Sequence, residues 1–181
     1  EVNGEARSRI GEQHRPEKVT IVHPAHGRVV IRDQKPMNEE ALRRCLQDGL
    51  TPTQWYQILN RRVFFWLSEE RLARLLGARA YRAERHCVLT LDTSEVIRRH
   101  APRITLSAIN SGSTVYAPQP RGLTTFRPIQ EYPFDIWRRR RRLRDAVVEL
   151  AVDNSVPDIV ECVLQVQERR GESILERVYT R

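Results

Sequence analysis

The chain has 181 residues, 40% of them hydrophobic and 30% charged, which is enough for one domain of ordinary size with its own core. No apolar run approaches the roughly 18 residues of a membrane-spanning helix, and no segment resembles a cleavable signal sequence, so we expect no membrane association. Three cysteines without a CxxC pair argue against a structural zinc site and predict reduced thiols in a cytoplasmic protein.

Residues 1–18 are polar and lack an apolar period, so we expect a mobile arm or the remnant of a loop. Because the chain starts at Glu1 and holds only one methionine, Met37, we expect further structure upstream. From residue 19 to residue 181 we expect a single α+β domain. In its first half, apolar or β-branched runs predict strands, and capped amphipathic stretches predict helices. The expected strands are 19–22, 28–31, 62–66 and 87–91, and the expected helices are 38–47, 53–59, one after Ser68, and 92–99.

Residues 101–133 contain five prolines and only one strand-like run, at 104–106. A long loop is costly in a compact domain and is typical of a binding region. Beyond it we expect a short helix at 134–137, strands at 146–152 and 159–166, and a short helix in the charged tail from Arg169.

The net charge is +8, and six clustered arginines account for most of it, because their removal leaves +2. Neighbouring like charges repel each other unless a polyanion or an acidic surface binds them. Arginine can bind phosphate oxygens with two hydrogen bonds at once. We therefore predict a nucleic-acid-binding segment, with an acidic protein partner as the alternative. Its residues are Arg138, Arg139, Arg140, Arg141, Arg142 and Arg144.

Several reaction classes lack their sequence signatures. There is no P-loop, no GxGxxG, no GxSxG, and no HxE combined with CxxC. His23 and His26 flank a proline with no further ligand nearby, which favours a turn over a metal site. We expect no metal.

Glu149 interrupts an apolar strand, on the same face as Val147 and Ala151. It is either an outward glutamate that pairs with an arginine or a carboxylate that lines a cleft. The same ambiguity applies to Asn110 and Ser111, which could form a plain turn before Gly112.

Several segments of the chain resemble an uncharacterised family of bacterial proteins, over residues from about 28 to 164. They are Gly49–Tyr56 (GLTPTQWY), Asn60–Trp66 (NRRVFFW), Ile109–Gly112 (INSG), Arg121–Gly122 with Thr125–Phe126, and Val148–Leu150 with Val156–Ile159. That family is in turn similar to the ADP-ribosyltransferases, in particular to the DarT toxins that modify DNA bases. The likeness rests on Phe64–Arg71 (FFWLSEER) and on Glu149 followed by Val156-Pro157.

The resemblance implies an ADP-ribosyltransferase-like fold, a split mixed or antiparallel sheet with flanking short helices. It implies NAD as substrate, Glu149 as the catalytic carboxylate and Arg71 as an NAD-binding residue, with Arg74 and Arg79 as alternatives. The opening strand block that grips NAD in these enzymes would lie upstream of Glu1, and His23 is its only substitute here. The other expected NAD-binding residues are Trp66, Ser68, Arg32, Asn110 and Ser111.

We therefore expect an NAD-dependent ADP-ribosyltransferase that modifies nucleic acid, with a DNA base favoured. The likeness to bacterial toxins makes an antitoxin a candidate partner, beside an acidic protein. A fixed carboxylate stabilises the oxocarbenium-like centre formed when nicotinamide leaves. The alternative is a non-catalytic nucleic-acid-binding module with a decayed NAD pocket.

Overall fold

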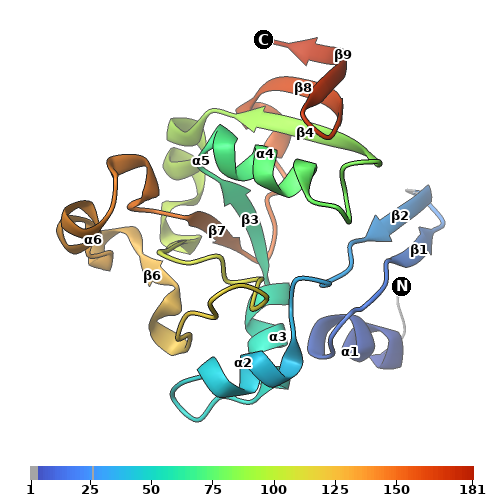
Figure 1. Ribbon diagram of the computed structural model, residues 1–181. Helices are drawn as coiled ribbons and strands as arrows, with labels where there is room; N and C mark the ends of the chain where they lie inside the picture. Colours follow the sequence, from blue (N-terminus) through green and yellow to red (C-terminus); the bar gives the residue numbers. More distant parts are fainter. Residues whose placement is uncertain (1–3, 26) are drawn as a thin grey trace. The chain divides into compact units, whose positions relative to one another are not determined.

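The computed structural model describes residues 4–25 and 27–181 (Figure 1). The chain divides into two compact units. Unit 1 comprises Glu1–Arg62 and Ile109–Phe126, and unit 2 comprises Val63–Ala108 and Arg127–Arg181. Helices occur together with antiparallel strand pairs, so the mixed α and β class is confirmed. The single domain from residue 19 and the ADP-ribosyltransferase-like sheet stay predictions.

Unit 1 is a small helical body with a two-stranded hairpin. In the hairpin, β1 pairs antiparallel with β2, and Val19 lies opposite Ile31. Both strands fall where the β-branched runs predict them. The elements of this unit are α1 (Gly4–Glu12), β1 (Val19–His23), β2 (Gly27–Ile31), α2 (Glu39–Cys45), α3 (Pro52–Asn60) and the 3₁₀ helix η2 (Leu123–Thr125).

The expectation that residues 1–18 lack regular structure is wrong over Gly4–Glu12, which form α1. The end of this helix is held by a residue far away in sequence. Asn60 at the end of α3 donates its side-chain amide to the Gly11 carbonyl at 2.9 Å, and its oxygen accepts from Arg15 at 3.1 Å. Because these partners come from α3, the local sequence pattern of the segment does not reveal the helix.

Helix α3 supplies the centre of unit 1. Thr51 and Gln54 form a reciprocal capping box and Pro52 opens the first turn, which together fix where the helix begins. Trp55 and Tyr56 are fully buried. The Trp55 ring stacks on Phe126 with ring centroids 6.0 Å apart. The long 109–126 segment is thereby packed on α3.

Arg121 is the largest buried polar side chain of unit 1, with 1% of its surface exposed. Its guanidinium donates to the carbonyls of Ser111, Ser113 and Gln119 at 2.9, 3.0 and 3.1 Å. Its backbone N–H also donates to the Cys45 carbonyl. A planar cation with several fixed donors can satisfy several loop carbonyls at once, and this holds the proline-rich segment in one conformation.

Unit 2 contains two sheets, with strand orders β3-β7-β5-β6 and β4-β8-β9 (Figure 1). Its strands are β3 (Arg62–Trp66, whose first residue belongs to unit 1), β4 (Arg85–Leu91), β5 (Ile104–Ser107), β6 (Arg127–Pro128), β7 (Glu149–Asp153), β8 (Val163–Arg170) and β9 (Ser173–Thr180). Its α-helices are α4 (Glu69–Gly77), α5 (Thr93–His100) and α6 (Phe134–Arg140). Its 3₁₀ helices are η1 (Ala101–Arg103), η3 (Ile129–Glu131), η4 (Leu143–Asp145) and η5 (Ile159–Cys162).

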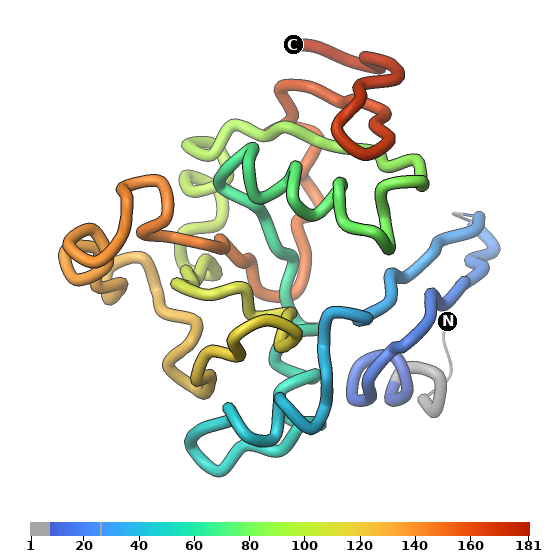
Figure 2. The backbone as a smooth tube through the Cα atoms, in the orientation of Figure 1, coloured from blue at the N-terminus to red at the C-terminus, as the bar shows by residue number. Residues whose placement is uncertain are grey.

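Two expectations for the end of the chain are wrong. Ile159–Cys162 form a 3₁₀ turn, so the last predicted strand begins only at Val163. The tail expected as a helix is the β8–β9 hairpin instead (Figure 2). Gly171 takes a φ of 55° at the turn, a conformation that glycine tolerates and that reverses the chain before a helix could start.

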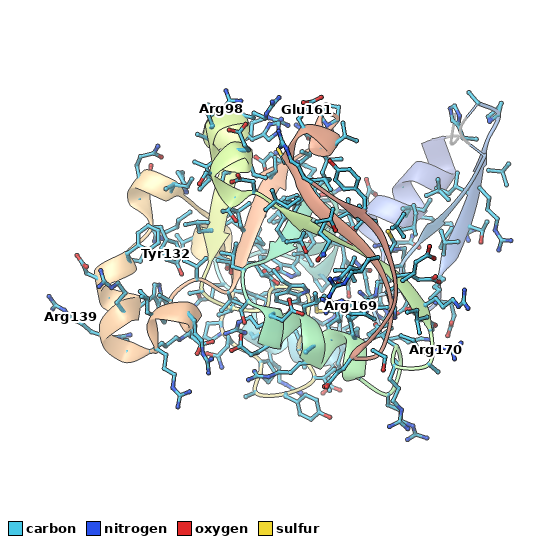
Figure 3. The ribbon with its side chains drawn as sticks, turned by 90° about the horizontal axis from the view of Figure 1, so that it is seen from above. Arg98, Tyr132, Arg139, Glu161, Arg169 and Arg170 are labelled. Atoms are coloured by element: carbon cyan, nitrogen blue, oxygen red, sulfur yellow. The ribbon has the colours of Figure 1, made fainter. Side chains whose placement is uncertain are left out.

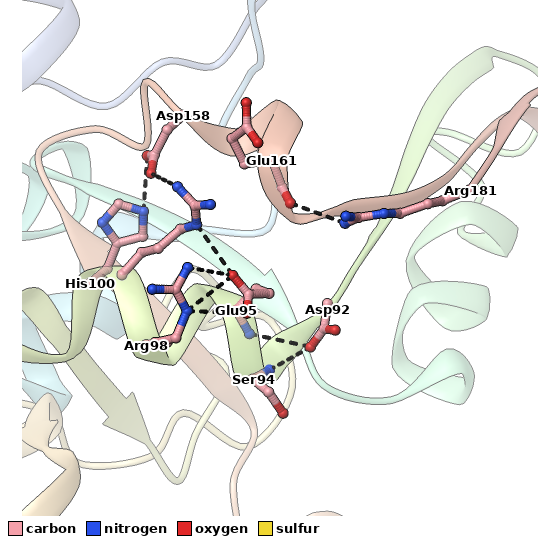
Figure 4. Close-up of polar contacts among 9 residues, drawn as sticks. Asp92, Ser94, Glu95, Arg98, His100, Asp158, Glu161 and Arg181 are labelled. Atoms are coloured by element: carbon pink, nitrogen blue, oxygen red, sulfur yellow. Dashed lines mark hydrogen bonds and ion pairs between the residues drawn. The ribbon is translucent and has the colours of Figure 1, made fainter.

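A polar network joins α5 to the Val156-Pro157-Asp158 turn (Figure 4). His100, which is 5% exposed, lies 3.0 Å from Asp158, and Arg99 lies 3.3 Å from the same carboxylate. Burial acts to raise the pKa of Asp158, but its backbone hydrogen bond, the Arg99 hydrogen bond and the nearby positive groups outweigh it, so the pKa is lowered. These contacts fix the turn that follows β7.

We expect Arg121→Lys to lower the free energy of unfolding by about 3 kcal/mol, because an ammonium cannot reach three separately placed carbonyls and leaves buried acceptors unsatisfied. Chemical denaturation measures the change. Arg44→Lys, at an exposed site on α2, is the matched control and should change stability by under about 0.5 kcal/mol. Equal stability of the two variants would contradict the assigned role of Arg121.

Candidate functional site

Glu149 is the first residue of β7, the strand that lies between β3 and β5. Only 5% of its surface is exposed, and the three residues after it are buried as well. It lies opposite Ser107 of β5, whose carbonyl accepts the Val148 N–H at 2.8 Å. The side chain is therefore inside unit 2, which excludes the solvent-facing alternative.

The local sequence explains this placement. Val148, Leu150 and Val152 are buried with it, so the strand is covered on both faces. Moving a carboxylate out of water is costly unless hydrogen bonds or positive charge compensate. A carboxylate held by such a strand has a fixed position.

Arg71 and Ser68 lie together at the start of α4. The Ser68 hydroxyl accepts from the Arg71 N–H at 3.4 Å as the helix cap, and it donates to Glu70 at 2.7 Å. The Arg71 guanidinium donates to Asp145 at 2.7 Å, while its buried Nε has no hydrogen-bond partner in the described structure. Asp145 stands four residues before Glu149, so Arg71 contacts the segment that leads into β7.

Trp66 ends β3, the strand adjacent to β7, and is half-buried. Trp66, Ser68, Arg71 and Glu149 thus all belong to unit 2. The hydrogen bonds connect Arg71 to Asp145 and Ser68 to the first turn of α4. The sheet order brings the strand of Trp66 next to that of Glu149.

The other four expected NAD-binding residues belong to unit 1. His23 is exposed at the end of β1, where its Nδ1 accepts the Ala25 N–H at 3.1 Å; His26 lies outside the described residues. Arg32 is exposed, and its carbonyl accepts from Arg15 at 3.3 Å. Asn110 is exposed, whereas Ser111 is buried and its carbonyl accepts a hydrogen bond from Arg121.

Unit 1 also holds two clefts, of about 500 and 740 Å³. The larger one is lined by residues of α1, the β1–β2 hairpin and the end of α3, among them Arg15 and Asn60. None of the expected NAD-binding residues lines either cleft.

The six clustered arginines separate into two groups. Arg141 lies over the Trp137 ring, 4.4 Å from its centroid, and donates to the Ala108 carbonyl. Arg144 pairs with Glu70. The other four are exposed, and no acidic side chain in the described part of the chain pairs with them; we call them the arginine ridge. The arginine ridge consists of Arg138, Arg139, Arg140 and Arg142.

Contacts before and after the arginine ridge hold its segment in place. The Tyr132 hydroxyl, before α6, donates to the Ala146 carbonyl at 2.6 Å, and its ring meets Phe134 edge-on at 4.8 Å. Burial raises the pKa of Tyr132 to about 12, against an opposing effect of Arg141. The side chain of Arg139 points outward from the α6 ribbon (Figure 3). The ridge is therefore an exposed cationic surface on a fixed support.

The sequence analysis did not identify Arg121, Asp145 and Glu70, whose contacts hold loops and helices in place. For two of them the sequence offers a hint. Asp145 is an acidic residue next to the arginine run, and Glu70 is an acidic residue at the start of a predicted helix. Arg121 has no such signal, because its partners are backbone carbonyls.

The fold and these contacts define a mixed α and β protein with one buried carboxylate on a central strand, preceded by an exposed arginine ridge. The chain belongs to a family of unknown function, DUF7002, whose model matches residues 1–163. No curated protein and no solved structure matches the chain.

In the part of the chain that the structure describes, none of the helices has both the length and the apolar character needed to cross a bilayer. No group of three or more His, Cys, Asp or Glu side chains among these residues is arranged to hold a metal ion.

We expect a double-mutant cycle on Arg71→Gln and Asp145→Asn to give a coupling energy of about 0.5–1.5 kcal/mol, because the pair is partly shielded from water. Chemical denaturation of the four proteins measures it. The exposed Glu39–Arg43 pair is the control and should give about 0.3–0.5 kcal/mol. No measurable coupling between Arg71 and Asp145 would show that the Arg71 guanidinium is not held by this carboxylate in solution.

Proposed function

We propose that the chain is an NAD-dependent ADP-ribosyltransferase that modifies nucleic acid, with a DNA base as the favoured acceptor. The observation that carries the proposal is the burial of Glu149 on a central strand, four residues after Asp145 and directly downstream of the arginine ridge. The resemblance of Phe64–Arg71 and of the β7 segment to DarT-like enzymes supports it.

The proposed reaction breaks the bond between nicotinamide and the ribose C1′ of NAD and joins C1′ to a nitrogen of the acceptor base, which loses a proton. Nicotinamide leaves with the bonding electron pair. The ribose gains positive charge in the transition state, and a carboxylate held in place stabilises such a charge without reorganising. Glu149 takes this role, since its strand fixes its position.

The residues around Arg71 fit an anionic ligand such as the NAD pyrophosphate. The Arg71 Nε is buried without a hydrogen-bond partner in the described structure, although its Nη2 is engaged by Asp145. A guanidinium offers five donors, so an anion can be held while the Asp145 contact persists. Ser68 caps α4, and Arg71 lies in the first turn of this helix, where the helix dipole favours negative charge.

The test incubates the chain with NAD labelled in its adenylate part, together with single-stranded DNA, duplex DNA or RNA. We expect label in nucleic acid, and a loss of about a hundredfold or more in rate for Glu149→Gln, because an amide cannot stabilise the positive charge. Glu161→Gln, at an exposed glutamate of the same unit, is the control and should keep full activity.

Thermal unfolding of both variants checks that the fold is intact. Full labelling by Glu149→Gln would remove the assigned role of Glu149. If neither labelling of any nucleic acid or protein nor NAD binding is detected with the intact chain, the enzyme proposal is wrong.

A second candidate function is nucleic-acid binding without catalysis, and a separate observation favours it. The four arginines of the ridge are exposed without acidic partners in the described structure, whereas Arg71, expected to hold NAD, is engaged by Asp145. Binding through the ridge requires neither Glu149 nor NAD.

Replacement of the four ridge arginines by serine should make nucleic-acid binding weaker and less dependent on salt, because fewer counterions are released. We expect the slope of log K against log salt to fall by about three to four. Fluorescence anisotropy over a salt series measures it. Arg28, Arg61, Arg82 and Arg170, which are exposed elsewhere, provide a charge-matched fourfold serine control. Equal losses for both variants would show that net charge, and not the ridge, binds the polyanion.

A further inference from the structure

The turn between the arginine ridge and β7 carries an exposed leucine (Figure 1). Leu143 is the first residue of η4, and 72% of its surface is open to water. A single exposed leucine is common on protein surfaces and is no evidence by itself. The neighbours of Leu143 and the hydrogen bonds of its turn set it apart from such residues.

Leu143 stands between two arginines at the end of the arginine ridge. Arg142, directly before it, is a member of the ridge, and Arg144, directly after it, pairs with Glu70. Glu149 follows six positions later. An apolar side chain therefore lies within the cationic surface, on the side of the ridge from which the chain enters β7.

Other exposed apolar residues of unit 2 have different neighbours. Ile136 of α6 is 52% exposed, but Asp135 precedes it, and a carboxylate repels phosphate. Val160 of η5 is 71% exposed and is followed by Glu161. Among the exposed apolar side chains described in this unit, Leu143 alone has an arginine on both sides.

Hydrogen bonds fix the backbone that presents Leu143. The Asp145 N–H donates to the Arg142 carbonyl at 2.8 Å, and the Ala146 N–H donates to the Leu143 carbonyl at 3.1 Å. The Asp145 carboxylate in turn accepts from Arg71 at 2.7 Å. Because the turn is already ordered, a ligand that contacts the leucine pays little for ordering it.

A nucleic acid offers both surfaces that this arrangement requires. Its phosphates bind arginines, and its stacked bases provide an apolar environment between their faces. Proteins that bind nucleic acid through arginines often insert a leucine, isoleucine or phenylalanine between two neighbouring bases and unstack them. Insertion takes the leucine side chain out of water, which offsets part of the cost of unstacking.

The proposed reaction requires an accessible base. A base inside a stack is shielded by its neighbours, so enzymes that act on a base commonly take it out of the stack first. We infer that Leu143 is a wedge that inserts beside the acceptor base and separates it from its neighbour, while the ridge arginines bind the flanking phosphates. This inference rests on the proposed action on nucleic acid and adds a residue that exposes the acceptor.

The test uses the 181-residue chain and a DNA strand of about ten nucleotides, single or in a duplex, a length typical of single-strand binding sites. Every second nucleotide carries 2-aminopurine, whose fluorescence is quenched while it is stacked. Saturating protein should raise the fluorescence at least about twofold, and Leu143→Ser should abolish this rise and slow labelling from NAD about tenfold or more. The Kd from fluorescence anisotropy should change less than about threefold, because phosphate contacts dominate the affinity.

Two further variants control for the loss of an apolar side chain. Leu143→Met should keep most of the rise, because methionine also serves as a wedge and is similar in size. Val160→Ser removes an equally exposed apolar residue of unit 2 and should change neither the fluorescence nor the Kd. Circular dichroism confirms the fold of each variant.

The outcomes separate this inference from the proposed function. A bound strand without a rise, or a rise that Leu143→Ser retains, would overturn the role of Leu143 and leave nucleic-acid binding in place. A rise that depends on Leu143 without any labelling would support the wedge and contradict the transferase activity. A strand that does not bind even at low salt would contradict both candidate functions and the wedge with them.

Discussion

The buried carboxylate of Glu149 is the constraint on which the functional interpretation depends. It stands where β7 enters the sheet, between two neighbouring strands and among buried valines and a leucine. A buried carboxyl group destabilises the fold unless its environment compensates for the lost hydration. Its presence inside an otherwise apolar strand is the strongest single indication of chemistry in unit 2.

The first turn of α4 contacts the segment that leads into the strand of this carboxylate. Glu69 pairs with Arg169 of β8 at 2.7 Å, and Glu70 pairs with Arg144 of η4. The Ser68 hydrogen bond, more than the charge of Arg144, lowers the pKa of Glu70. Acidic groups at a helix start are favoured by the helix dipole, so these contacts agree with the local electrostatics. One helix start thereby contacts both β8 and the segment that leads into β7.

The sequence predicts most elements whose signals are local. The cap residues Asn38, Ser68 and Asp92 each accept backbone hydrogen bonds at the helix starts where the pattern places them. The strand at 62–66 is confirmed as well. The two failures have different causes. Helix α1 is held by Asn60, which is distant in sequence. The tail pairs with the neighbouring β8 because Gly171 reverses the chain.

The candidate site is less predictable than the fold. The apolar flanks of Glu149 predict a strand but leave an outward and an inward side chain as alternatives, and the structure shows that the side chain is buried. The pairing of Arg71 with Asp145 could not be predicted from the sequence, since the two residues are 74 positions apart and the arginine-rich stretch offers many possible partners for an acid. Likewise, only the structure shows that Arg141 and Arg144 have partners within the chain, whereas the arginines of the ridge are exposed without acidic partners among the described residues.

That separation links the two proposed functions physically. Arg141 and Arg144 use their charges to fix the segment, through Ala108 and Glu70, while the four ridge arginines remain outside. Asp145 pairs with Arg71, so contacts at Arg141, Arg144 and Asp145 hold the chain at three points within five residues. A polyanion bound at the ridge would therefore be presented by a segment whose continuation is the strand of the buried carboxylate. A protein that only bound nucleic acid would need the ridge and its anchors, but not a carboxylate inside the next strand. The retention of both features in one continuous segment favours catalysis on a bound polyanion over binding alone.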